Sequence, residues 1–362
     1  MRLEYHRPPV RVAVVGLGRS FFSSHYPVFK AHPALFKIVA ACDIIKERRD
    51  MIAGDFPDCK MFRRFSDMLD ERDIDLVDIA TCSTDHVKHA LMSLERGLWT
   101  LLESPMALTL DDAQLLRGAA TKAKNRLLVL QRGLFAPDFL LAKSMMGDPR
   151  LGEIYQICIR REDFIRRDDW QTVKRLGGGA AYYAMTDLIL QALKILPQPP
   201  IQMWSELKRV ASLGDAEDYA KIILTAPGKP LFDIELSKQD AYAGNGWLYN
   251  IYAKNGSLRA NHKVVEWQWF DPEEKAIPEL QLTPLRKPEN GYPMYCGETL
   301  NWHKETIELS GDPFTSAVHL YYTMIYNHLV NGAELEITAE QVRRQIRVNE
   351  LIHAQNPLEQ KY

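Results

Sequence analysis

The sequence predicts an α/β protein of two domains, and three observations carry this prediction. The 362 residues exceed the usual size of one hydrophobic core. Over residues 1–130, short apolar runs alternate with helical stretches, which is typical of a doubly wound parallel sheet with helices on both faces. Over residues 131–362, several strand-like runs follow one another without helices between them, which indicates an α+β domain built on a mixed sheet.

The first domain is expected to alternate between strand and helix. Apolar runs with few charges predict its strands, at Val10–Val15, Ile38–Cys42, Leu76–Thr81, Trp99–Glu103 and Leu127–Leu130. Apolar residues at helical spacing predict the helices between them, at Phe21–His32, Lys46–Asp55, Phe65–Asp70, His86–Arg96 and Leu110–Lys124. Gly97 directly follows Arg96, where a glycine commonly ends a helix, and this supports the boundary.

The second domain is expected to begin with a helix at Pro137–Met146 and a strand at Glu153–Arg160. Three glycines at 177–179 then precede a buried helix at Ala180–Leu196. Further strands are predicted at Met203–Ser212, Tyr219–Ala226, Leu231–Lys238, Trp247–Ala253 and Ser257–Ala260, the last two joined by an Asn-Gly hairpin turn. A loop-rich segment at 271–297 precedes two helices, at Thr315–Asn331 and Thr338–Ala354.

Composition argues against several classes of function. The formal net charge of −2 and the isoelectric point near 6.6 give no general attraction to nucleic acid or to an anionic membrane. No apolar run has the length of a signal-peptide core or of a membrane span, so we expect a cytoplasmic protein. The histidines show no metal-ligand spacing with an acid or a cysteine, and no metal site is expected. The expected partner is therefore a small-molecule substrate.

The segment after the first strand carries the most informative motif. The strand runs straight into Gly-Leu-Gly-Arg-Ser at 16–20, and a helix is predicted directly after this turn. A helix N-terminus offers free N–H groups to a diphosphate, while Gly16 permits a tight turn and Gly18 lets phosphates approach the backbone. Phe21 stands where a third glycine usually permits close packing of helix on strand. Asp43 ends the next strand, 25 residues after Gly18, which completes the pattern of a dinucleotide-binding site.

The same aspartate bears on the identity of the dinucleotide. A carboxylate at the end of the second strand accepts hydrogen bonds from the adenosine ribose and repels a 2′-phosphate, so Asp43 favours NAD over NADP. NADP stays possible, because nearby cations could neutralise such a phosphate: Arg19, Lys46, Arg48 and Arg49. A solvated helix face explains these cations more simply.

Several segments together resemble the Gfo/Idh/MocA oxidoreductases. They are Val10–Arg19, Ala41–Asp43, Asp75–Thr81 with His86, and Glu103–Pro105 with Ala107. The similarity continues through the segments 152–154, 177–180, 255–257, 321–332 and 338–351, so it covers nearly the whole chain. The resemblance implies an N-terminal Rossmann domain and a C-terminal α+β domain. It also implies that the open sheet of the second domain forms the contacts of a homodimer or homotetramer.

The resemblance implies a complete cofactor site but an altered reaction site. The positions that match cofactor-binding residues of the family are Gly16, Gly18, Arg19, Ser20, Asp43, Thr81, His86, Glu103 and Pro105. Where the family has the lysine of a Glu-Lys-Pro motif, this chain has Ser104. Tyr183 stands at the family's catalytic aspartate and Asp187 at its histidine. A serine hydroxyl has no useful pKa near neutrality, so the family's usual proton relay is disfavoured.

Tyr183 and Asp187 are the candidate catalytic residues. They lie four residues apart, so on one helix they would share a face. Tyr183 would donate a proton as hydride arrives from the cofactor, provided that Lys174, Arg175 or another cation lowers its pKa. Such a pair suits reduction of a C=O or C=N bond, and it resembles the thiazolinyl imine reductases, which also lack the lysine. The alternative is structural: Tyr183 fills a gap in the core and Asp187 makes a structural hydrogen bond.

The charged stretch before the three glycines is the candidate substrate-recognition segment. Trp170 is expected to offer a stacking surface, while Lys174 and Arg175 bring positive charge close to the tyrosine. For the arginines at 160–161 and 166–167, a solvated loop is the simpler interpretation.

Three hypotheses for the function follow from these residues. The first is an NAD(P)-dependent oxidoreductase that acts on a small polar substrate, sugar-like, carbonyl or imine, with a non-standard proton relay. The second is a catalytically silent NAD-binding sensor or scaffold of the same fold. The third, transient use of NAD for elimination or glycoside cleavage, ranks lowest because no residue is an evident proton-abstracting base.

Overall fold

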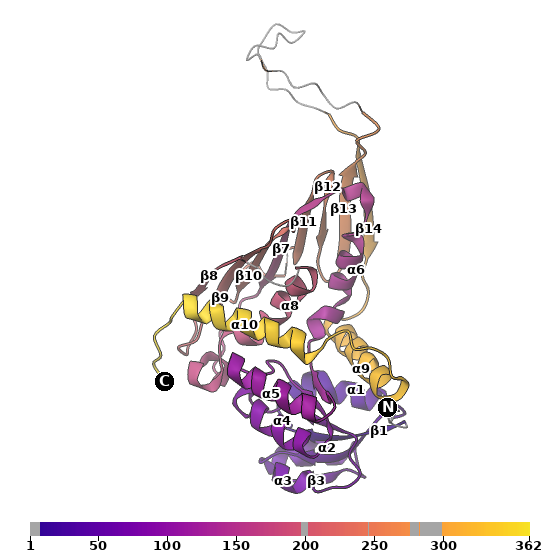
Figure 1. Cartoon of the computed structure of the whole chain (residues 1–362), viewed down its shortest axis with the longest axis vertical. Coiled ribbons are helices and arrows are strands. Elements are labelled where there is room, and N and C mark those ends of the chain that lie inside the picture. Colours follow the sequence, from indigo (N-terminus) through magenta and orange to yellow (C-terminus); the bar gives the residue numbers. More distant parts are fainter. Residues whose placement is uncertain (1–7, 197–201, 245, 276–281, 283–298) are drawn as a thin grey trace.

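The computed structural model describes residues 8–196, 202–244, 246–275, 282 and 299–362. These residues form two sheets, one in each half of the chain (Figure 1). The predicted loop-rich segment at 271–297 lies largely outside the described residues.

Sheet A, in the first half, is a six-stranded parallel sheet in the order β3-β2-β1-β4-β5-β6. Its strands are β1 (Val10–Val15), β2 (Phe36–Cys42), β3 (Lys60–Phe62), β4 (Leu76–Ile79), β5 (Trp99–Leu102) and β6 (Leu127–Val129). The order runs outward from β1 on one side and from β4 on the other. The carboxyl ends of β1 and β4 therefore flank the crevice where doubly wound folds bind their ligands. The predicted doubly wound fold is confirmed.

The helices of sheet A are α1 (Tyr26–Ala31), α2 (Lys46–Ala53), α3 (Phe65–Met68), α4 (His86–Glu95) and α5 (Leu110–Lys122). All five fall within predicted helices, although α1 starts later than expected. A π-helical turn, Phe21–His25, precedes it. β3 was not predicted, because three residues that begin with an exposed lysine give no strand periodicity.

Sheet B, in the second half, has eight strands in the order β14-β13-β12-β11-β7-β10-β9-β8. The strands are β7 (Ile154–Glu162), β8 (Gln202–Lys208), β9 (Tyr219–Thr225), β10 (Leu231–Ser237), β11 (Tyr249–Ala253), β12 (Gly256–Ala260), β13 (Val264–Phe270) and β14 (Trp302–Glu308). β7 and β10 are parallel and all other neighbours are antiparallel, which confirms the predicted mixed sheet. The predicted Asn-Gly turn joins β11 to β12.

The helices of the second half are α6 (Pro137–Met145), α7 (Ala180–Tyr183), α8 (Thr186–Ile195), α9 (Pro313–Asn331) and α10 (Ala339–Gln355). Figure 1 shows α6, α8 and α10 along one face of sheet B. The single helix predicted at Ala180–Leu196 is wrong, because the chain breaks into α7 and α8 at Ala184 and Met185. The Arg161 guanidinium donates to the carbonyl of Ala184, 3.4 Å away, at this break.

Helix α9 ties the two halves together. Although it lies late in the sequence, it contacts α1 and sends two fully buried tyrosines toward sheet A. The Tyr321 hydroxyl donates to the carbonyl of Val129 at 2.6 Å, and the Tyr322 hydroxyl donates to Asp78 at 2.8 Å. The boundary between residues 130 and 131 stays a prediction, since α9 packs on both sides of it.

Candidate cofactor and active site

A cavity of about 670 Å³ opens at the carboxyl ends of β1, β2 and β4. Val15, Cys42 and Ala80, at or next to these strand ends, lie on its wall. This is the point where the strand order of sheet A reverses, which is the usual ligand site of such sheets. The volume lies within the range of cofactor pockets in proteins.

The glycine turn fits a diphosphate in the way that the sequence predicts. Gly16 has a φ of +92°, and a Cβ there would lie 2.7 Å from backbone atoms of Ala80 and Thr81, so no other residue fits. Beside Gly18 the nearest group is the Arg48 guanidinium at 3.8 Å, which leaves its backbone open to a ligand. Together with Arg19 and Ser20, both glycines line the cavity.

Phe21, at the position of the third glycine, does not block this cavity. Its side chain is fully buried and is absent from the cavity wall. The ring packs edge-on against Phe22 and Tyr26, with centroids 5.2 and 5.9 Å apart. The wider π-helical turn thus accommodates an aromatic ring where glycine would otherwise allow close packing.

Asp43 lies on the cavity wall at the end of β2 and is 6% exposed. Its carboxylate accepts hydrogen bonds from the backbone N–H groups of Leu17, at 2.9 Å, and Ile45, at 2.8 Å. Arg48 lies 3.4 Å from the same carboxylate. The backbone therefore fixes a negative charge where the ribose of an adenosine would lie.

Of the nearby cations weighed from sequence, two turn away from the cavity. Lys46 pairs with Asp50 at 2.6 Å, and Arg49 donates to the backbone carbonyl of Asp43. Neither residue lies on the cavity wall, so for these two the solvated-face interpretation holds.

Three other arginines do line the cavity near Asp43: Arg48, Arg63 and Arg64. Arg63 and Arg64 follow β3, whose pairing with β2 sets Phe62 opposite Cys42 and brings the two arginines to the end of β2. Neither forms an ion pair within the described part of the chain. Sequence reasoning missed both, because it did not predict β3.

A segment of the second half covers the glycine turn. Arg19 forms an ion pair with Asp169 at 3.1 Å and donates to the side-chain oxygen of Gln171 at 2.8 Å. Trp170, the predicted stacking residue, lies between these partners and lines the same cavity. The predicted substrate tryptophan and the predicted cofactor turn therefore share one cavity wall.

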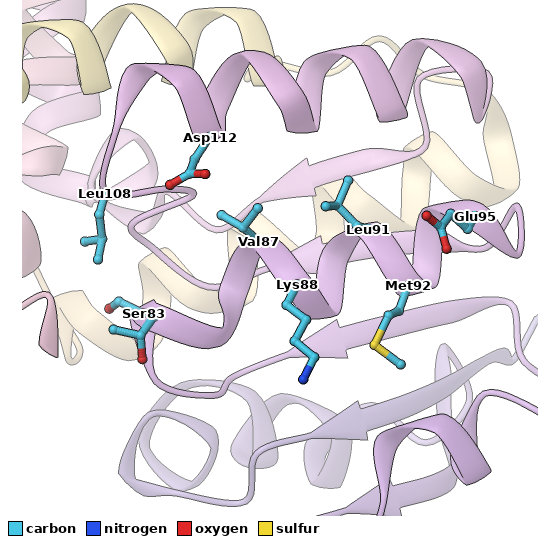
Figure 2. A pocket seen from close by; sticks show the side chains of 9 residues that line it. Ser83, Val87, Lys88, Leu91, Met92, Glu95, Leu108 and Asp112 are labelled. Carbon is cyan, nitrogen blue, oxygen red and sulfur yellow. The ribbon is translucent and has the colours of Figure 1, made fainter.

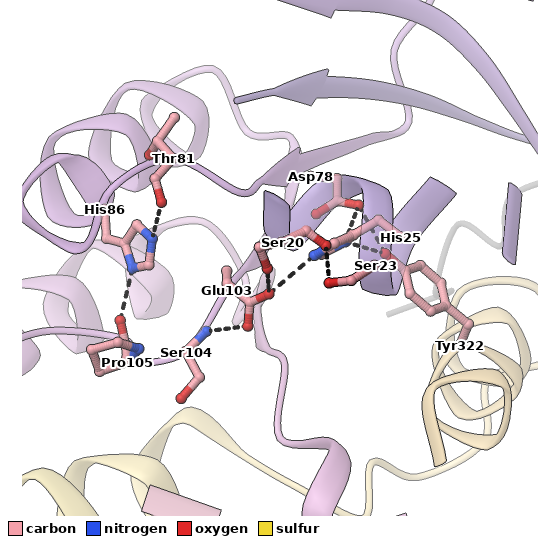
Figure 3. Close-up of polar contacts among 10 residues, drawn as sticks. All are labelled: Ser20, Ser23, His25, Asp78, Thr81, His86, Glu103, Ser104, Pro105 and Tyr322. Atoms are coloured by element: carbon pink, nitrogen blue, oxygen red, sulfur yellow. Dashed lines mark hydrogen bonds and ion pairs between the residues drawn. The ribbon is translucent and has the colours of Figure 1, made fainter. Parts of the chain in front are cut away.

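Thr81 lies on the cavity wall, while His86 lies behind it. His86 is fully buried, with its ring nitrogens 2.8 Å from the carbonyl of Pro105 and 3.1 Å from that of Thr81 (Figure 3). Burial lowers the pKa of His86, so its imidazole is neutral at physiological pH. His86 thus joins the segments that follow β4 and β5 and does not touch the cavity itself.

A buried cluster connects the glycine turn to the end of β5 (Figure 3). The His25 imidazole donates to Asp78 at 2.8 Å and to Glu103 at 3.2 Å, and all three side chains are buried. Tyr322 donates to Asp78, and the Ser20 hydroxyl donates to Glu103. Each histidine nitrogen faces a carboxylate, so both carry a proton.

The charged groups of this cluster stabilise one another. Burial alone would lower the pKa of His25, but Asp78 and Glu103 outweigh burial and raise it well above its ordinary value. Burial alone would raise the pKa of Glu103, but His25 and, at longer range, Arg132 hold it well below its ordinary value. Glu103 is therefore a fixed carboxylate, as a cofactor-binding residue at this position requires.

The backbone N–H of Ser104 donates to the Glu103 carboxylate at 2.8 Å, but its hydroxyl contacts no ionisable group among the described residues. Its hydroxyl lies 3.4 Å from the Thr186 hydroxyl and 3.5 Å from the side-chain nitrogen of Gln131. These neutral groups do not activate a serine, so the position has lost the proton chemistry of a lysine.

Tyr183 ends α7 and is half-buried under a cation. The Arg167 guanidinium lies 5.0 Å from its ring centroid. Burial raises the pKa of Tyr183 to about 12, and Arg167 opposes this rise. The hydroxyl donates to no residue in the described part of the chain, and Tyr183 is not among the residues that line the cavity.

Asp187, in the first turn of α8, is 7% exposed and packs on Gly133. A Cβ on Gly133 would lie 2.5 Å from the Asp187 Cβ, so glycine is needed there. No described residue donates a hydrogen bond to its carboxylate, unlike the structural role weighed from sequence. Because of the break after α7, the argument that Tyr183 and Asp187 share one helix face does not hold.

Lys174 and Arg175 do not reach the tyrosine. The Lys174 ammonium donates to the backbone carbonyl of Leu358, and Arg175 is exposed. Neither lies on the cavity wall. The cations on the Tyr183 ring are instead Arg167 and Lys238.

A second hollow, of about 460 Å³, lies on the other side of α4, toward the start of α5 (Figure 2). Lys88 and Met92 line both hollows, because α4 forms the wall between them. None of the predicted site residues lies in the second hollow.

The described residues form neither a cluster that could hold a metal ion nor a helix that could cross a membrane. Over residues 8–275, with their gaps, and 299–362, no group of three or more histidine, cysteine or acidic side chains is placed to hold a metal ion. Within the same ranges, no helix combines the length and the apolar character that crossing a bilayer requires.

Comparison with known proteins agrees with this architecture. The profile of an oxidoreductase family with an NAD-binding Rossmann fold (GFO_IDH_MocA) matches residues 10–131, and that of the GFO/IDH/MocA C-terminal domain matches residues 139–259. An uncharacterized oxidoreductase of Schizosaccharomyces pombe, C26H5.09c, is 30% identical over 258 residues, 69% of this chain and 70% of that protein. The chain belongs to the Gfo/Idh/MocA oxidoreductases. The predicted family and its NAD-binding fold are thereby confirmed.

More distant relatives of this family member are similar over nearly the full length. The scyllo-inositol 2-dehydrogenase (NADP(+)) IolW of Bacillus subtilis is 23% identical and covers 94% of this chain and 92% of its own. The WlbA dehydrogenase of Bordetella pertussis, solved in complex with NADH and UDP-GlcNAcA, has a TM-score of 0.74 at 18% identity. That comparison covers 96% of this chain and 95% of the WlbA chain.

Proposed function

We propose that this protein moves a hydride between a nicotinamide dinucleotide and a small polar substrate, with reduction of a C=O or C=N bond as the favoured direction. The observation that carries the proposal is the cavity at the switch point of sheet A. Its lining includes the glycine turn, the carboxylate of Asp43, and Trp170 from the second half.

The residues fit the cofactor as follows. Gly16, Gly18 and Ser20 would hold the diphosphate, and Asp43 the adenosine ribose. Glu103 would accept a hydrogen bond from the nicotinamide end, since Ser20 and His25 fix its carboxylate at the end of β5. Once bound, the nicotinamide supplies or accepts the hydride. The charge of Asp43 favours NAD(H) over NADP(H).

The proton has to come from a group other than the missing lysine. Tyr183 has a free hydroxyl, and we assign it the role of proton donor. Asp187 is 7% exposed and no described residue donates to its carboxylate, whose oxygens are not among the fully buried polar atoms without a partner, so we assign it the role of accepting a hydrogen bond from a polar group of the ligand. Lys174 and Arg175 have no part in this proposal, because Lys174 donates to the Leu358 carbonyl, Arg175 is exposed, and neither contacts the Tyr183 ring.

The substrate class rests on the relatives. IolW is named for an inositol, and WlbA was solved with a nucleotide sugar. Both molecules carry several hydroxyl groups, so a hydroxylated, sugar-like carbonyl compound is the first substrate class to test.

The second candidate is an NAD-binding sensor or scaffold without turnover. Two observations favour it: the Ser104 hydroxyl contacts only neutral groups among the described residues, and burial raises the pKa of Tyr183 to about 12. A poorly matched acid gives slow proton transfer.

The deciding experiment combines binding with turnover. NADH binding is measured by calorimetry, and oxidation of NADH is then followed across a panel of sugar-derived ketones, aldehydes and imines. Turnover that falls at least about 100-fold in Tyr183→Phe, with NADH affinity unchanged, supports the oxidoreductase. Binding without turnover on any compound supports the sensor. Absence of binding to either dinucleotide contradicts both.

For the quaternary structure, we propose a homodimer or homotetramer through sheet B. Tyr155 and Tyr252, stacked with centroids 6.3 Å apart, are 59% and 37% exposed, and Trp204 on β8 is 52% exposed. Exposed aromatic side chains on a sheet are typical of interfaces. Light scattering should give a dimer or tetramer mass that Tyr252→Glu lowers, and an unchanged mass would contradict this interface.

A further inference from the structure

Lys238 lies directly after β10. It is the one buried lysine among the described residues, with 6% of its surface exposed. Lysine is almost never fully buried unless it is paired, because an ammonium loses its hydration there. Burial lowers the pKa of Lys238, and its pairing with Asp163 opposes this. A buried lysine of this kind indicates that its charge has a specific role at this position.

The partner of Lys238 comes from the neighbouring parallel strand. β7 and β10 end at Glu162 and Ser237, which face each other in the register, and Asp163 and Lys238 are the next residues on each strand. The ammonium lies 2.6 Å from one carboxylate oxygen of Asp163. The other oxygen is buried and has no partner among the described residues.

The Tyr183 ring lies next to this ion pair. The Lys238 ammonium is 5.8 Å from the ring centroid, and the Arg167 guanidinium is 5.0 Å from it. Two cations thus flank one phenol. The carboxylates of Asp163, Glu217 and Asp169 raise the pKa of Tyr183, whereas Arg167 lowers it.

A chain of ion pairs connects this group to the cofactor turn. Arg167 pairs with Asp169 at 2.6 Å, and Asp169 pairs with Arg19 at 3.1 Å. Arg19 belongs to the glycine turn and lines the cavity. Tyr183, Arg167 and Lys238 do not line the cavity themselves, and Asp169 connects Arg167 to its wall.

We propose that Lys238 is a positioning residue whose ammonium stabilises the negative charge that Tyr183 acquires when it gives up its proton. Lys238 would thereby supply, from a different strand, the positive charge that the family places at Ser104. This inference rests on the proposed role of Tyr183 as proton donor.

The step balances as follows for a carbonyl substrate. The carbon accepts a hydride from the reduced nicotinamide, and the electron pair of the C=O bond moves to oxygen. The O–H bond of Tyr183 breaks and the substrate oxygen takes the proton, so the carbonyl is reduced to an alcohol and the nicotinamide is oxidised. The tyrosinate that remains beside Lys238 and Arg167 regains its proton from solvent.

A purely structural pair explains part of the same geometry, since Lys238 and Asp163 join the ends of β7 and β10. That interpretation predicts a loss of stability on mutation, and it gives the ionisation of Tyr183 no part in the reaction. The titration measures the electrostatic effect of Lys238 on Tyr183 directly, and the kcat of Lys238→Met shows whether turnover depends on that effect.

The experiment places 2,3-difluorotyrosine at position 183 and follows its ¹⁹F signal against pH, without cofactor or substrate. Fluorination lowers the pKa of the phenol into a range where the protein stays folded. In Lys238→Met we expect the pKa of this residue to rise by about one unit, a tenfold change in the ionisation constant. Lys238→Arg, which keeps the charge, should return it to within about 0.3 units of the wild-type value.

Lys221→Met is the matched control. Lys221 lies on β9 of the same sheet and also pairs with acidic residues, Asp233 and Glu235, but it makes no contact with Tyr183. We expect no shift there. Lys238→Gln, whose amide can still donate to Asp163, replaces Lys238→Met if the latter fails to fold by circular dichroism.

An unchanged pKa of the fluorotyrosine in both neutral variants would overturn the proposal. So would an equal shift in Lys221→Met. Because the titration needs neither dinucleotide nor turnover, its result is independent of whether the proposed oxidoreductase activity is found. If turnover is found, kcat should fall in Lys238→Met with the KM for NADH unchanged.

Discussion

The cofactor side and the reaction side of this molecule make different demands on the sequence. At the turn after β1, the demand is for backbone shape, and Gly16 meets it because a Cβ would overlap the chain after β4. At the proposed reaction side, the demand is for side-chain chemistry, and the resemblance implies that Ser104, Tyr183 and Asp187 stand at the positions of the family's three groups. A site defined by backbone geometry thus persists while a site defined by side chains carries new groups.

The strongest test of the cofactor side is Gly16→Ala. The added Cβ would lie 2.7 Å from backbone atoms, and the residue would keep a φ of +92° that alanine rarely adopts. We expect the affinity for NADH to fall by at least about 100-fold, equivalent to about 2.7 kcal/mol, in calorimetry.

The control for this variant is Gly118→Ala. Gly118 lies in α5 with no neighbour within 4 Å, so alanine should stabilise the helix by about 0.5–1 kcal/mol and leave binding unchanged. Normal NADH binding by Gly16→Ala would show that the turn is merely structural.

The buried cluster beneath both sides should give a large effect on the free energy of unfolding. His25→Gln leaves Asp78 and Glu103 buried without a counter-charge, which costs about 3–5 kcal/mol. Urea denaturation measures this loss. His303→Gln, at an exposed pair with Glu274, should change stability by less than about 0.5 kcal/mol.

The same cluster predicts a pH dependence with a defined sign. Folding raises the pKa of His25, so its contribution is fully present below about pH 6.5 and is lost as the pH rises toward the folded pKa. Folding lowers the pKa of Glu103, so its contribution is present above about pH 4.5 and is lost at lower pH. The stability difference between wild type and His25→Gln should therefore shrink between pH 6 and pH 10. A difference that stays flat or grows over this range would contradict a charged His25.

A third variant, Asp43→Asn, tests how the cofactor side selects between NADH and NADPH. It removes the negative charge, while Arg48, Arg63 and Arg64 stay on the cavity wall. We expect the ratio of NADPH to NADH affinity to rise by about tenfold or more, because a guanidinium binds a phosphate well once the repelling carboxylate is gone. Asp50→Asn, off the cavity wall, should leave the ratio unchanged. The same ratio in both variants would remove Asp43 as the selectivity residue.

The smallest effect is expected where the two sides meet. Arg19 is 63% exposed at its pair with Asp169, so Arg19→Ala should change stability by no more than about 0.5 kcal/mol. Release of NADH should nevertheless become several-fold faster in stopped-flow measurements, since the segment around Trp170 loses its contact with the glycine turn. An unchanged release rate would show that this segment does not retain the cofactor.

Much of the first half was predictable, because strands buried on both faces and helices of regular period leave clear patterns. The second half was predictable where strands alternate strictly, as in β9 and β10. β13 shows the same alternation in Val-Val-Glu-Trp-Gln-Trp-Phe, so its signal was present and was missed. β14 carries polar, mostly exposed residues and gives little signal.

The parts of the site that were not predictable depend on contacts between distant segments. Ala184 and Met185 favour a helix by propensity, yet the chain breaks there, next to a contact with Arg161 from β7. His25 and Tyr322 are 297 positions apart. No residue next to Lys238 in the sequence indicates that this lysine is buried and paired with Asp163. Local patterns record periodicity and turn chemistry, whereas such pairings emerge from the folded topology.

The hydrogen bond from Tyr322 to the Asp78–His25 pair has a consequence for how this protein can evolve. A charge cluster inside the nucleotide-binding half is completed by a helix encoded near the other end of the gene. Recombination that replaces the second half by one without this tyrosine would remove a hydrogen-bond donor from the buried carboxylate of Asp78. We therefore expect the two halves to be inherited together, and new specificities to arise by substitution within this chain more readily than by exchange of domains.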